Sequence, residues 1–501
     1  MKDRKIILFY PKPDKENSNM HLPLPVLAVA SDLLKDGYSV EIIDERKEPD
    51  YRRQLRNKLE ETALFGVSAM TGYQIEGGLN ASHFVRSINK NIPIVWGGWH
   101  VSMLPEESLG SPYIDIGVIG PGEEALQQIY ASTARNTSLS EVAGIIHKNG
   151  KGEIINSKKN NALDKLHTIS KHALKLINVS DYVCNTELGS KSIFWVTSSG
   201  CPFNCGFCCS LKVYNRHWQG LEAEKILEDM QFLKKCYGIN GMNFVDTNFF
   251  VDKERVVRLA SGIIERKLDV QWAASVRVDQ INLFDNEFLK LLKRSGCLKL
   301  FVGAESGSKE VLELIDKDIN IEDIFKMARV LDKTGIIAEI FVMAGFPLDP
   351  QKDIHETLSL AKKIKEAYPN HQFTSFIYTP YPGTPLYGMA LRNGLKVPNR
   401  IEEWSSWNML EVMTPWIRTK GYSDRLHSFT KLYYPLAFPS DNLRKKFKDL
   451  KTGWIYWLLY KIESFRVKNN FFLLPLEWTM LKFINKLKTK SIFLKNLGGF
   501  R

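Results

Sequence analysis

Short hydrophobic segments alternate with helix-like segments along the first part of the chain. Five apolar runs have the length and composition of strands, at residues 5–10, 39–44, 64–70, 92–98 and 114–120. Amphipathic stretches around residues 26–37 and 76–89 lie between them. This alternation predicts a parallel sheet wrapped by helices, a doubly wound Rossmann-like domain. Ligands bind beyond the carboxyl ends of the strands in such a domain, so the residues that follow each strand are candidate ligand contacts.

The same alternation resumes at residue 192 and continues to residue 400, in the runs SIFWVTSSG, GMNFVDTN, VQWAASVR, LKLFVGAES, AEIFVMAGFP and QFTSFIYTPY. Six strand–loop–helix units predict a partial (βα)6 TIM-type barrel with its chemistry on the loops at the carboxyl ends. The predicted fold class is therefore α/β. It has four parts: a Rossmann-like domain at 1–145, a hairpin and linker at 146–190, the partial barrel at 191–400, and a mainly helical region at 401–501.

Positive charge is concentrated at one end of the chain. Of the formal net charge of +12, residues 441–501 carry +10, from 14 Lys or Arg against 4 Asp or Glu, so the first 440 residues carry +2. Aromatic runs there, such as TGWIYWLLY, fall short of the ~18–20 apolar residues that cross a bilayer. Such a tail suits either peripheral contact with an anionic membrane or packing as a helical appendage, and both interpretations stay open.

Cysteine usage points to metal or thiol chemistry in a reducing compartment. The chain has 7 cysteines, which is too few for a disulfide scaffold in 501 residues, and four of them crowd into the segment 201–209. The N-terminus, MKDRKIILFY, lacks the apolar stretch and cleavage site of a secretory signal. We expect a cytoplasmic protein, at the inner membrane surface if the tail binds lipid.

Three of these cysteines, Cys201, Cys205 and Cys208, form a CxxxCxxC motif directly after the first predicted barrel strand. Three thiolates on a tight loop can ligate three irons of a cubane cluster and leave the fourth iron open to an exogenous ligand. Cys209 follows immediately, and adjacent residues rarely reach the same cubane, so we interpret it as a neighbour. The alternative for the motif is a structural metal site.

The motif, with the aromatic Phe207 before its last cysteine, resembles that of the radical SAM superfamily. The resemblance implies a 4Fe-4S cluster whose open iron chelates S-adenosylmethionine (SAM), and one-electron cleavage of SAM to methionine and a 5'-deoxyadenosyl radical. It also implies that residues at later strand ends hold SAM, here Asp246, Ser275, Arg277 and Glu305, and that FVMAGFP, residues 341–347, passes near adenine. Each of these charged residues alone would be interpreted as part of an ordinary surface ion pair.

The strand ends of the first domain carry small and polar residues: Ser68, Thr71, Gly97, Gly98, His100, Gly120, Gly122 and Glu123. Together they resemble the cobalamin-binding domain that precedes many radical SAM domains. The loop after the first strand, YPKPDKEN, lacks the Asp-x-His-x-x-Gly motif of many cobalamin proteins, so we expect no histidine ligand to cobalt. Pro121 stands where relatives often have an acidic residue. The alternative is a vestigial or nucleotide-binding Rossmann-like unit.

Residues 380–404 resemble the branch that contains the anaerobic magnesium-protoporphyrin ester cyclase and hopanoid-modifying methyltransferases. This resemblance implies methyl transfer from cobalamin to an unactivated carbon of a large hydrophobic small molecule, a lipid or a tetrapyrrole. It also implies an electron donor of the flavodoxin or ferredoxin type. A radical cyclase or oxidoreductase of the tetrapyrrole type and a non-catalytic corrinoid or redox sensor remain alternatives, and no catalytic side chain is predicted.

A tRNA-modifying methylthiotransferase is a further alternative with a clear signature in the sequence. Such a protein would carry three additional clustered cysteines in its N-terminal domain, but no cysteine precedes Cys184. The charge of the first 440 residues is also nearly balanced, as shown above. We therefore expect no nucleic-acid substrate or partner.

Overall fold

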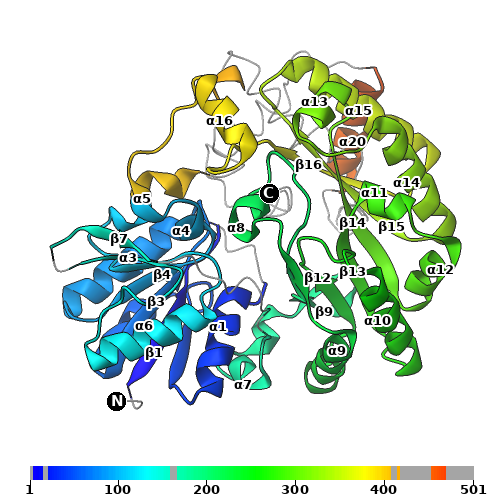
Figure 1. The fold of residues 1–501 in the computed structure, drawn as a ribbon. Coiled ribbons are helices and arrows are strands. Elements are labelled where there is room, and N and C mark those ends of the chain that lie inside the picture. The colour runs from blue at the N-terminus through cyan, green and yellow to red at the C-terminus, as the bar shows by residue number, and fades with distance from the viewer. Residues whose placement is uncertain are drawn as a thin grey trace.

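The computed structural model of the chain describes residues 4–14, 21–149, 151–157, 166, 168–407, 414–417 and 453–469. Two sheets stand side by side, each with helices packed on it (Figure 1). The first sheet belongs to the N-terminal part and the second to the middle of the chain. The fold is therefore α/β, as predicted.

The first sheet has the order β2-β1-β3-β4-β5-β6-β7. Its first five strands are parallel: β1 (Lys5–Tyr10), β2 (Val40–Asp44), β3 (Thr62–Ser68), β4 (Ile94–Gly97) and β5 (Ile116–Val118). The order 2-1-3-4-5 is that of a doubly wound domain with its switch point between β1 and β3. All five predicted strands are confirmed. The sequence pattern reveals them because a strand covered on both faces is apolar throughout.

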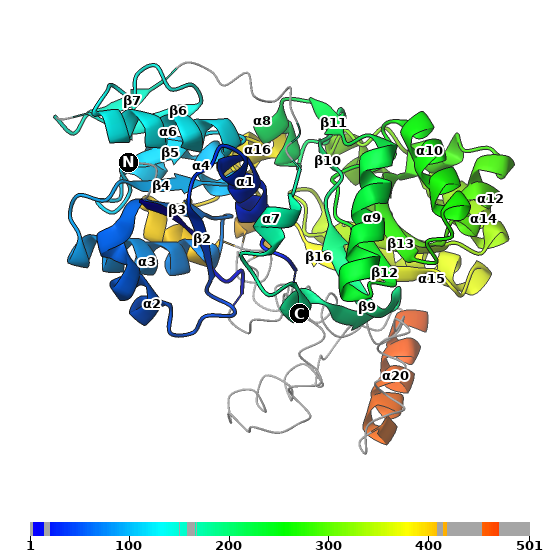
Figure 2. The same ribbon diagram turned by 90° about the horizontal axis from the view of Figure 1, so that it is seen from below.

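Helices cover both faces of this sheet (Figure 2). One face carries α1 (Leu24–Lys35) and α6 (Glu123–Arg135), and the other carries α2 (Tyr51–Lys58) and α3 (Gln74–Ile88). The predicted helices correspond to α1 and α3. Two short helices, α4 (Trp99–Met103) and α5 (Pro105–Leu109), follow β4.

A β-hairpin extends the first sheet beyond its parallel part. Strand β6 (Ile145–Lys148) pairs antiparallel with β5 and with β7 (Ile154–Asn156). The hairpin expected in 146–190 is thus present, and it continues the first sheet. The chain then passes through α7 (Lys171–Leu174), η3 (Val179–Tyr182) and β8 (Cys184–Thr186) to the second sheet.

The second sheet has the order β16-β15-β14-β13-β12-β9-β8 and curls into an open half-barrel (Figure 1). Six strands run parallel: β9 (Gly189–Trp195), β12 (Gly241–Phe244), β13 (Gln271–Arg277), β14 (Cys297–Glu305), β15 (Ile337–Ala344) and β16 (Gln372–Ile377). They confirm the six predicted strands. The antiparallel β8 closes one edge. The outer helices are α9 (Ala223–Tyr237), α10 (Lys253–Glu265), α12 (Asn286–Arg294), α14 (Ile321–Thr334) and α15 (Pro350–Ala367).

The chain returns to the first domain after the half-barrel. Helix α16 (Pro385–Arg392) and the 3₁₀ helix η4 (Ile401–Ser406) follow β16. Buried side chains from this stretch join the core on the α3 side of the first sheet: Ala390, Leu395, Ile401, Trp404 and Trp407. Farther on, the described residues form η5 (Pro415–Ile417) and α20 (Gly453–Lys468), which packs beside α15. Much of the region predicted as helical, 401–501, lies outside the described residues.

Candidate active site

The three motif cysteines lie on a loop that begins after the short strand β10 (Ser198–Gly200) and ends at α8 (Ser210–Tyr214). Gly200 has φ +78°, and a Cβ there would collide with the His217 carbonyl oxygen, so only glycine suits this entry to the loop. Farther along, the Gly206 N–H donates to the Ile315 carbonyl at 2.8 Å. The entry of the loop therefore packs closely against the backbone at His217, and its middle is anchored to the half-barrel through Ile315.

The Cys205 side chain is buried, those of Cys201 and Cys208 are half-buried, and the three thiols are close enough to affect one another electrostatically. Burial, with a smaller contribution from Cys205 and Cys201, raises the pKa of Cys208 to about 11. Burial also raises the pKa of Cys209 to about 12, and Cys208 is the one motif cysteine that contributes to this shift. Cys209 in turn contributes to the raised pKa of the Tyr378 and Tyr381 hydroxyls. These neighbours favour Cys201, Cys205 and Cys208 as the ligand set, which stays a prediction.

The number of thiols on this loop suits a multi-iron cluster. In a cubane each cysteine binds a different iron, so three thiols leave the fourth iron without a protein thiolate. That these three thiols hold a 4Fe-4S cluster stays a prediction.

Arg277, at the end of β13, reaches the cysteine loop. Its Nη1 donates to the Cys205 Sγ at 3.2 Å, its Nη2 to the Lys317 carbonyl at 2.6 Å, and its Nε to Asp279 Oδ1 at 2.9 Å. The guanidinium lies 3.8 Å from the ring centroid of Phe203 in the same loop. This side chain supports a predicted cluster ligand, a role that the sequence did not suggest. Its predicted contact with the SAM carboxylate stays a prediction.

Glu305, at the end of β14, is buried and paired. The Lys317 Nζ donates to Glu305 Oε1 at 2.6 Å, and both side chains are almost inaccessible. Burial acts to lower the pKa of Lys317, but the Glu305 carboxylate and the Cys205 thiolate hold it above its ordinary value. The same Nζ lies 5.9 Å from the ring centroid of Phe207. Glu305 and Phe207 are thus brought together by a lysine that sequence reasoning missed.

Asp246, after β12, is fully engaged within the protein. It accepts hydrogen bonds from the Thr197 N–H at 2.6 Å, the Thr197 hydroxyl at 2.5 Å and the Ser198 hydroxyl at 2.7 Å. Arg255 supports the same segment through the Thr197 carbonyl at 3.2 Å. In this arrangement Asp246 orients the chain that enters the cysteine loop. Its contact with SAM stays a prediction, as does that of Ser275, which lies half-buried on β13.

In the first domain, the loops after β3 and β4 are locked together. The Thr71 Oγ1 lies 3.0 Å from His100 Nδ1. The Ala69 N–H donates to the Gly97 carbonyl at 3.0 Å, and the His100 N–H donates to the Ala69 carbonyl at 3.2 Å. Gly98 has φ +95°, and a Cβ there would stand 2.6 Å from the Ala69 oxygen. The glycine therefore permits this close approach of two backbones.

His100 lies inside the protein. Its side chain is completely buried, burial lowers its pKa to about 4, and its ring centroid is 5.9 Å from that of Trp404. Contacts of His100, Thr71 and Ser68 with cobalamin stay predictions.

The loop after β5 leaves open space for a ligand. Gly120 has φ +83°, and a Cβ there would meet no atom within 4 Å. Its N–H donates to the Ser102 hydroxyl at 2.9 Å, which fixes this loop to α4, the short helix after β4. Gly122 precedes α6, and Glu123 stands in the first turn of that helix. A bare, fixed backbone at the carboxyl edge of the sheet fits a bulky ligand such as cobalamin.

The predicted cobalamin-binding loops and the cysteine loop both adjoin α8. The Trp99 ring of the first domain meets the Tyr214 ring of α8 edge-on, with centroids 5.8 Å apart. Burial, together with the Glu123 carboxylate, raises the pKa of Tyr214 to about 12. Helix α8 thus lies between the two sheets, beside the glycine loops of one and the cysteine loop of the other (Figure 1).

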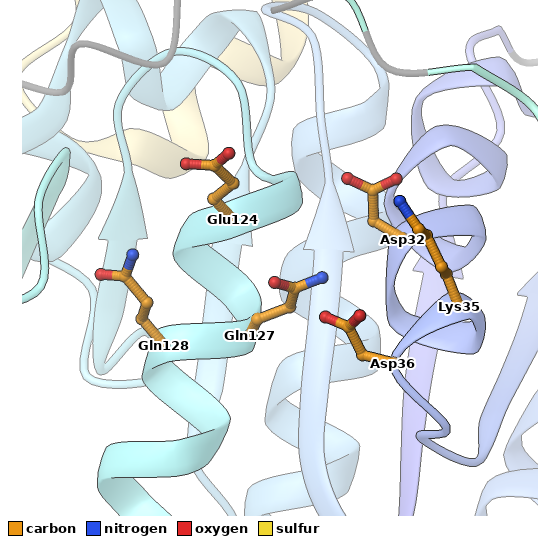
Figure 3. Close-up of a pocket in the computed structure, with 6 residues that line it drawn as sticks. All are labelled: Asp32, Lys35, Asp36, Glu124, Gln127 and Gln128. Atoms are coloured by element: carbon orange, nitrogen blue, oxygen red, sulfur yellow. The ribbon is translucent and has the colours of Figure 1, made fainter.

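A separate surface pocket lies between α1 and α6 (Figure 3). Its volume is about 180 Å³, and polar side chains line it: Asp32, Lys35, Asp36, Glu124, Gln127 and Gln128. None of the predicted cofactor contacts belongs to this set, so the pocket is distinct from the site at α8.

Comparison with known proteins agrees with this geometry. Residues 195–361 match the family model of the radical SAM superfamily, so the half-barrel is a radical SAM domain. Residues 18–130 match the model of the B12-binding domain. The chain therefore belongs to the cobalamin-binding radical SAM family. It is an enzyme that depends on a 4Fe-4S cluster, SAM and cobalamin.

Individual relatives span most of the chain. An uncharacterized methyltransferase of Pyrococcus horikoshii is 28% identical over 79% of this chain and 83% of its own length. The anaerobic magnesium-protoporphyrin IX monomethyl ester cyclase of Rubrivivax gelatinosus is 23% identical over 85% of this chain and 77% of its own. The solved structure of the radical SAM methyltransferase TsrM from Kitasatospora setae, with cobalamin and a 4Fe-4S cluster bound, has a TM-score of 0.66. It is 16% identical and covers 88% of this chain and 90% of its own, which supports the fold.

Proposed function

We propose that this enzyme transfers a methyl group to an unactivated carbon of a large hydrophobic substrate. The observation that carries the proposal is the contact of Trp99 with Tyr214, which brings the glycine loops of the B12-binding domain against the helix after the cysteine motif. When bound, the cluster and SAM supply a radical that removes a substrate hydrogen, and cobalamin supplies the methyl group. A substrate that binds beside α8 would be close to both predicted sites.

Aromatic side chains from the segment after the half-barrel pack against the first domain. The completely buried Trp404 packs on His100, and the Trp407 Nε1 donates to the Pro380 carbonyl at 2.9 Å. These contacts attach the segment after the half-barrel to the core of the first domain and keep water out of that core. They thereby hold the B12-binding domain and the half-barrel together, as a substrate shared between the two would require.

One buried hydroxyl offers a polar contact for a ligand. Tyr378 follows β16, stacks on Phe346 with centroids 4.6 Å apart, and is buried. Its hydroxyl has no hydrogen-bond partner among the described residues. A buried hydroxyl without a partner is destabilising by about 1–3 kcal/mol, so a ligand that accepts a hydrogen bond from it would be favoured here. This supports a bound small molecule at the carboxyl edge of the half-barrel.

The substrate class follows from the relatives and from the tail. The cyclase of Rubrivivax gelatinosus is named for a tetrapyrrole, and the Pyrococcus horikoshii protein is named as a methyltransferase. A tetrapyrrole or a lipid of comparable size is the substrate we propose. The electron that the cluster needs is proposed to come from a flavodoxin- or ferredoxin-type donor.

An exposed face of α20 suits contact with a membrane that would hold such a substrate. Trp454, Trp457 and Phe465 are 67%, 59% and 63% exposed, and their helical spacing places them on one side. Leu459 is buried on the opposite side. Within the described ranges, no helix has both the length and the hydropathy needed to cross a membrane. We propose peripheral contact of this face with anionic lipid, aided by the basic charge of residues 441–501.

The experiment uses the full chain, reconstituted anaerobically with iron, sulfide and hydroxocobalamin. Reductant, an extract of the source organism and SAM with a deuterated methyl group are added, and products are analysed by mass spectrometry. The proposal expects 5'-deoxyadenosine and a hydrophobic product that has gained one deuterated methyl group. An unlabelled product that has lost hydrogen would indicate a cyclase or oxidoreductase. Retention of all cofactors without SAM-dependent product would indicate a sensor.

A further inference from the structure

Lys317 occupies an unusual turn beside the cysteine loop. The turn follows α13 (Lys309–Leu314), and the residues on either side of the lysine, Asp316 and Asp318, have φ +52° and +55°. Residues other than glycine seldom adopt this left-handed conformation, and it persists only where the surrounding structure enforces it. Lys317 itself is 6% exposed. The fold therefore holds a lysine ammonium inside the protein at a backbone of raised energy.

Three hydrogen bonds tie this turn to the cysteine loop and to β13. The Gly206 N–H, between Cys205 and Cys208, donates to the Ile315 carbonyl at 2.8 Å. The Asn204 side chain donates to Asp316 Oδ2 at 2.9 Å. Arg277 Nη2 donates to the Lys317 carbonyl at 2.6 Å. The position of Lys317 is thus coupled to that of the loop that holds the predicted cluster ligands.

The charged groups at this point form a short chain. Arg277 meets the Cys205 Sγ at 3.2 Å, and Lys317 Nζ meets Glu305 Oε1 at 2.6 Å. Glu305 is itself at φ +66°, directly after a register shift in the pairing of β14 with β15. Two cations and one buried carboxylate therefore stand around the Cys205 side of the loop. Asp279, the other partner of Arg277, is about a third exposed.

We propose that Lys317 is a positioning residue that neutralises Glu305 and, with Arg277, provides the positive charge that favours the reduced state of the cluster. The proposal rests on the cluster assignment of the family. The role proposed for Lys317 goes beyond that assignment, because neither the motif nor the family match points to residue 317. Lys317 acts through Glu305 and the charge near Cys205, and is not expected to touch the reacting atoms.

The physical reason is the sign of the charge that reduction adds. One electron converts the cluster from the 2+ to the 1+ state, so the cluster becomes more negative. In a buried, weakly polarisable environment, a neighbouring cation stabilises the added charge and a neighbouring carboxylate opposes it. Removing Lys317 and removing Glu305 must therefore shift the reduction potential in opposite directions.

The test is a redox titration of the reconstituted full chain without SAM, with mediators supplying the electron and electron paramagnetic resonance reporting the 1+ cluster. Lys317→Met is expected to make the potential more negative, and Glu305→Gln to make it less negative. The double variant removes one charge of each sign, so its potential is expected close to that of the parent protein. A purely structural role would not give shifts of opposite sign.

Lys309→Met is the matched control, because Lys309 is exposed on α13 and pairs only with the exposed Glu313 within the described structure. It is expected to leave the potential unchanged. Equal potentials in the parent, Lys317→Met and Glu305→Gln proteins at full iron content would overturn the proposal, as would shifts of the same sign. If the Lys317→Met protein loses its iron, the test rests on the Glu305→Gln protein, and an unchanged reduction potential in that variant refutes the proposal. A parent protein that binds no cluster would refute the cluster assignment instead.

Discussion

The backbone hydrogen bonds that join the loops after β3 and β4 give a prediction whose magnitude can be worked out from the structure. Gly98→Ala places a methyl group at a residue with φ +95° and ψ −172°, a region that only glycine occupies readily. The new Cβ would stand 2.6 Å from the Ala69 oxygen and 3.0 Å from its nitrogen. Ala69 cannot move without breaking its hydrogen bonds to Gly97 and His100. We therefore expect the loops to separate more easily.

The backbone strain alone is worth about 1–3 kcal/mol, and a tenfold change in an equilibrium corresponds to about 1.4 kcal/mol. Local opening of these loops should therefore rise roughly 5- to 150-fold in the variant. Hydrogen exchange measured by mass spectrometry on the full chain without cofactors reports this opening at the amides of Ala69 and His100. The cysteine loop should exchange as in the parent protein.

Gly97→Ala is the matched control. Its added Cβ would meet only the Val118 Cβ, at 3.8 Å, which is an ordinary contact. Exchange at Ala69 and His100 should stay at the parent level. Retention of cobalamin should nevertheless fall, because Gly97 is predicted to face the ligand. Unchanged exchange in Gly98→Ala would refute the claim that glycine is needed for the close contact of these two loops. Unchanged cobalamin retention in both variants would refute the predicted ligand site.

Three further predictions concern other parts of the molecule. Arg277→Lys replaces the planar guanidinium, which contacts Cys205 and is predicted to bind the SAM carboxylate, with a point charge. SAM affinity measured by calorimetry is expected to fall about tenfold, and unchanged affinity at full iron content would contradict the prediction. Burial raises the pKa of Asp353 to about 7 from 3.8, so the native state binds this proton more tightly than the unfolded state. Stability should therefore fall by up to about 4 kcal/mol between about pH 4 and pH 7 in urea titrations. Asp353→Asn should lack that slope, and an equal slope in the variant would refute the assignment. Replacing Trp454 and Trp457 by Ser should abolish the salt-resistant part of sedimentation with anionic vesicles, and sedimentation equal to the parent's would leave α20 as a packed appendage.

The strands of the first sheet could be predicted because helices cover both of its faces. In β1, for example, Ile6, Ile7, Leu8 and Phe9 are all buried, so the run is apolar without interruption. The hairpin β6–β7 was expected, but its place as an extension of the first sheet depends on pairing with β5. That pairing leaves no periodic pattern in the sequence.

The packing of Ile401 and Trp404 on the first domain could not be predicted for a similar reason. These residues follow the half-barrel in the chain, yet they complete the core beside α3. Their apolar character was visible in the sequence, but the partner surface was not. Contacts between segments so far apart carry no local signal.

In the candidate site too, some features could be predicted from the sequence and others could not. The three cysteines were readable because their spacing on one loop is local, and the structure keeps them close together. Asp246 was predicted as a SAM contact from its position after a strand, which stays a prediction, and its hydrogen bonds with Thr197 and Ser198 could not be foreseen because those residues lie about 50 positions earlier. Lys317 was missed because its role depends on a left-handed turn and on Glu305, and neither is visible from one residue's neighbours.

The most direct measurement compares four alanine variants of the reconstituted full chain for iron content and for 5'-deoxyadenosine formed from SAM under reduction. The account predicts that replacing Cys201, Cys205 or Cys208 removes most of the iron and abolishes deoxyadenosine, because each binds a separate iron of the cubane. Replacing Cys209 should leave both near the parent level. Loss of iron in Cys209→Ala, or deoxyadenosine formed at the parent rate without one of the other three thiols, would contradict the account.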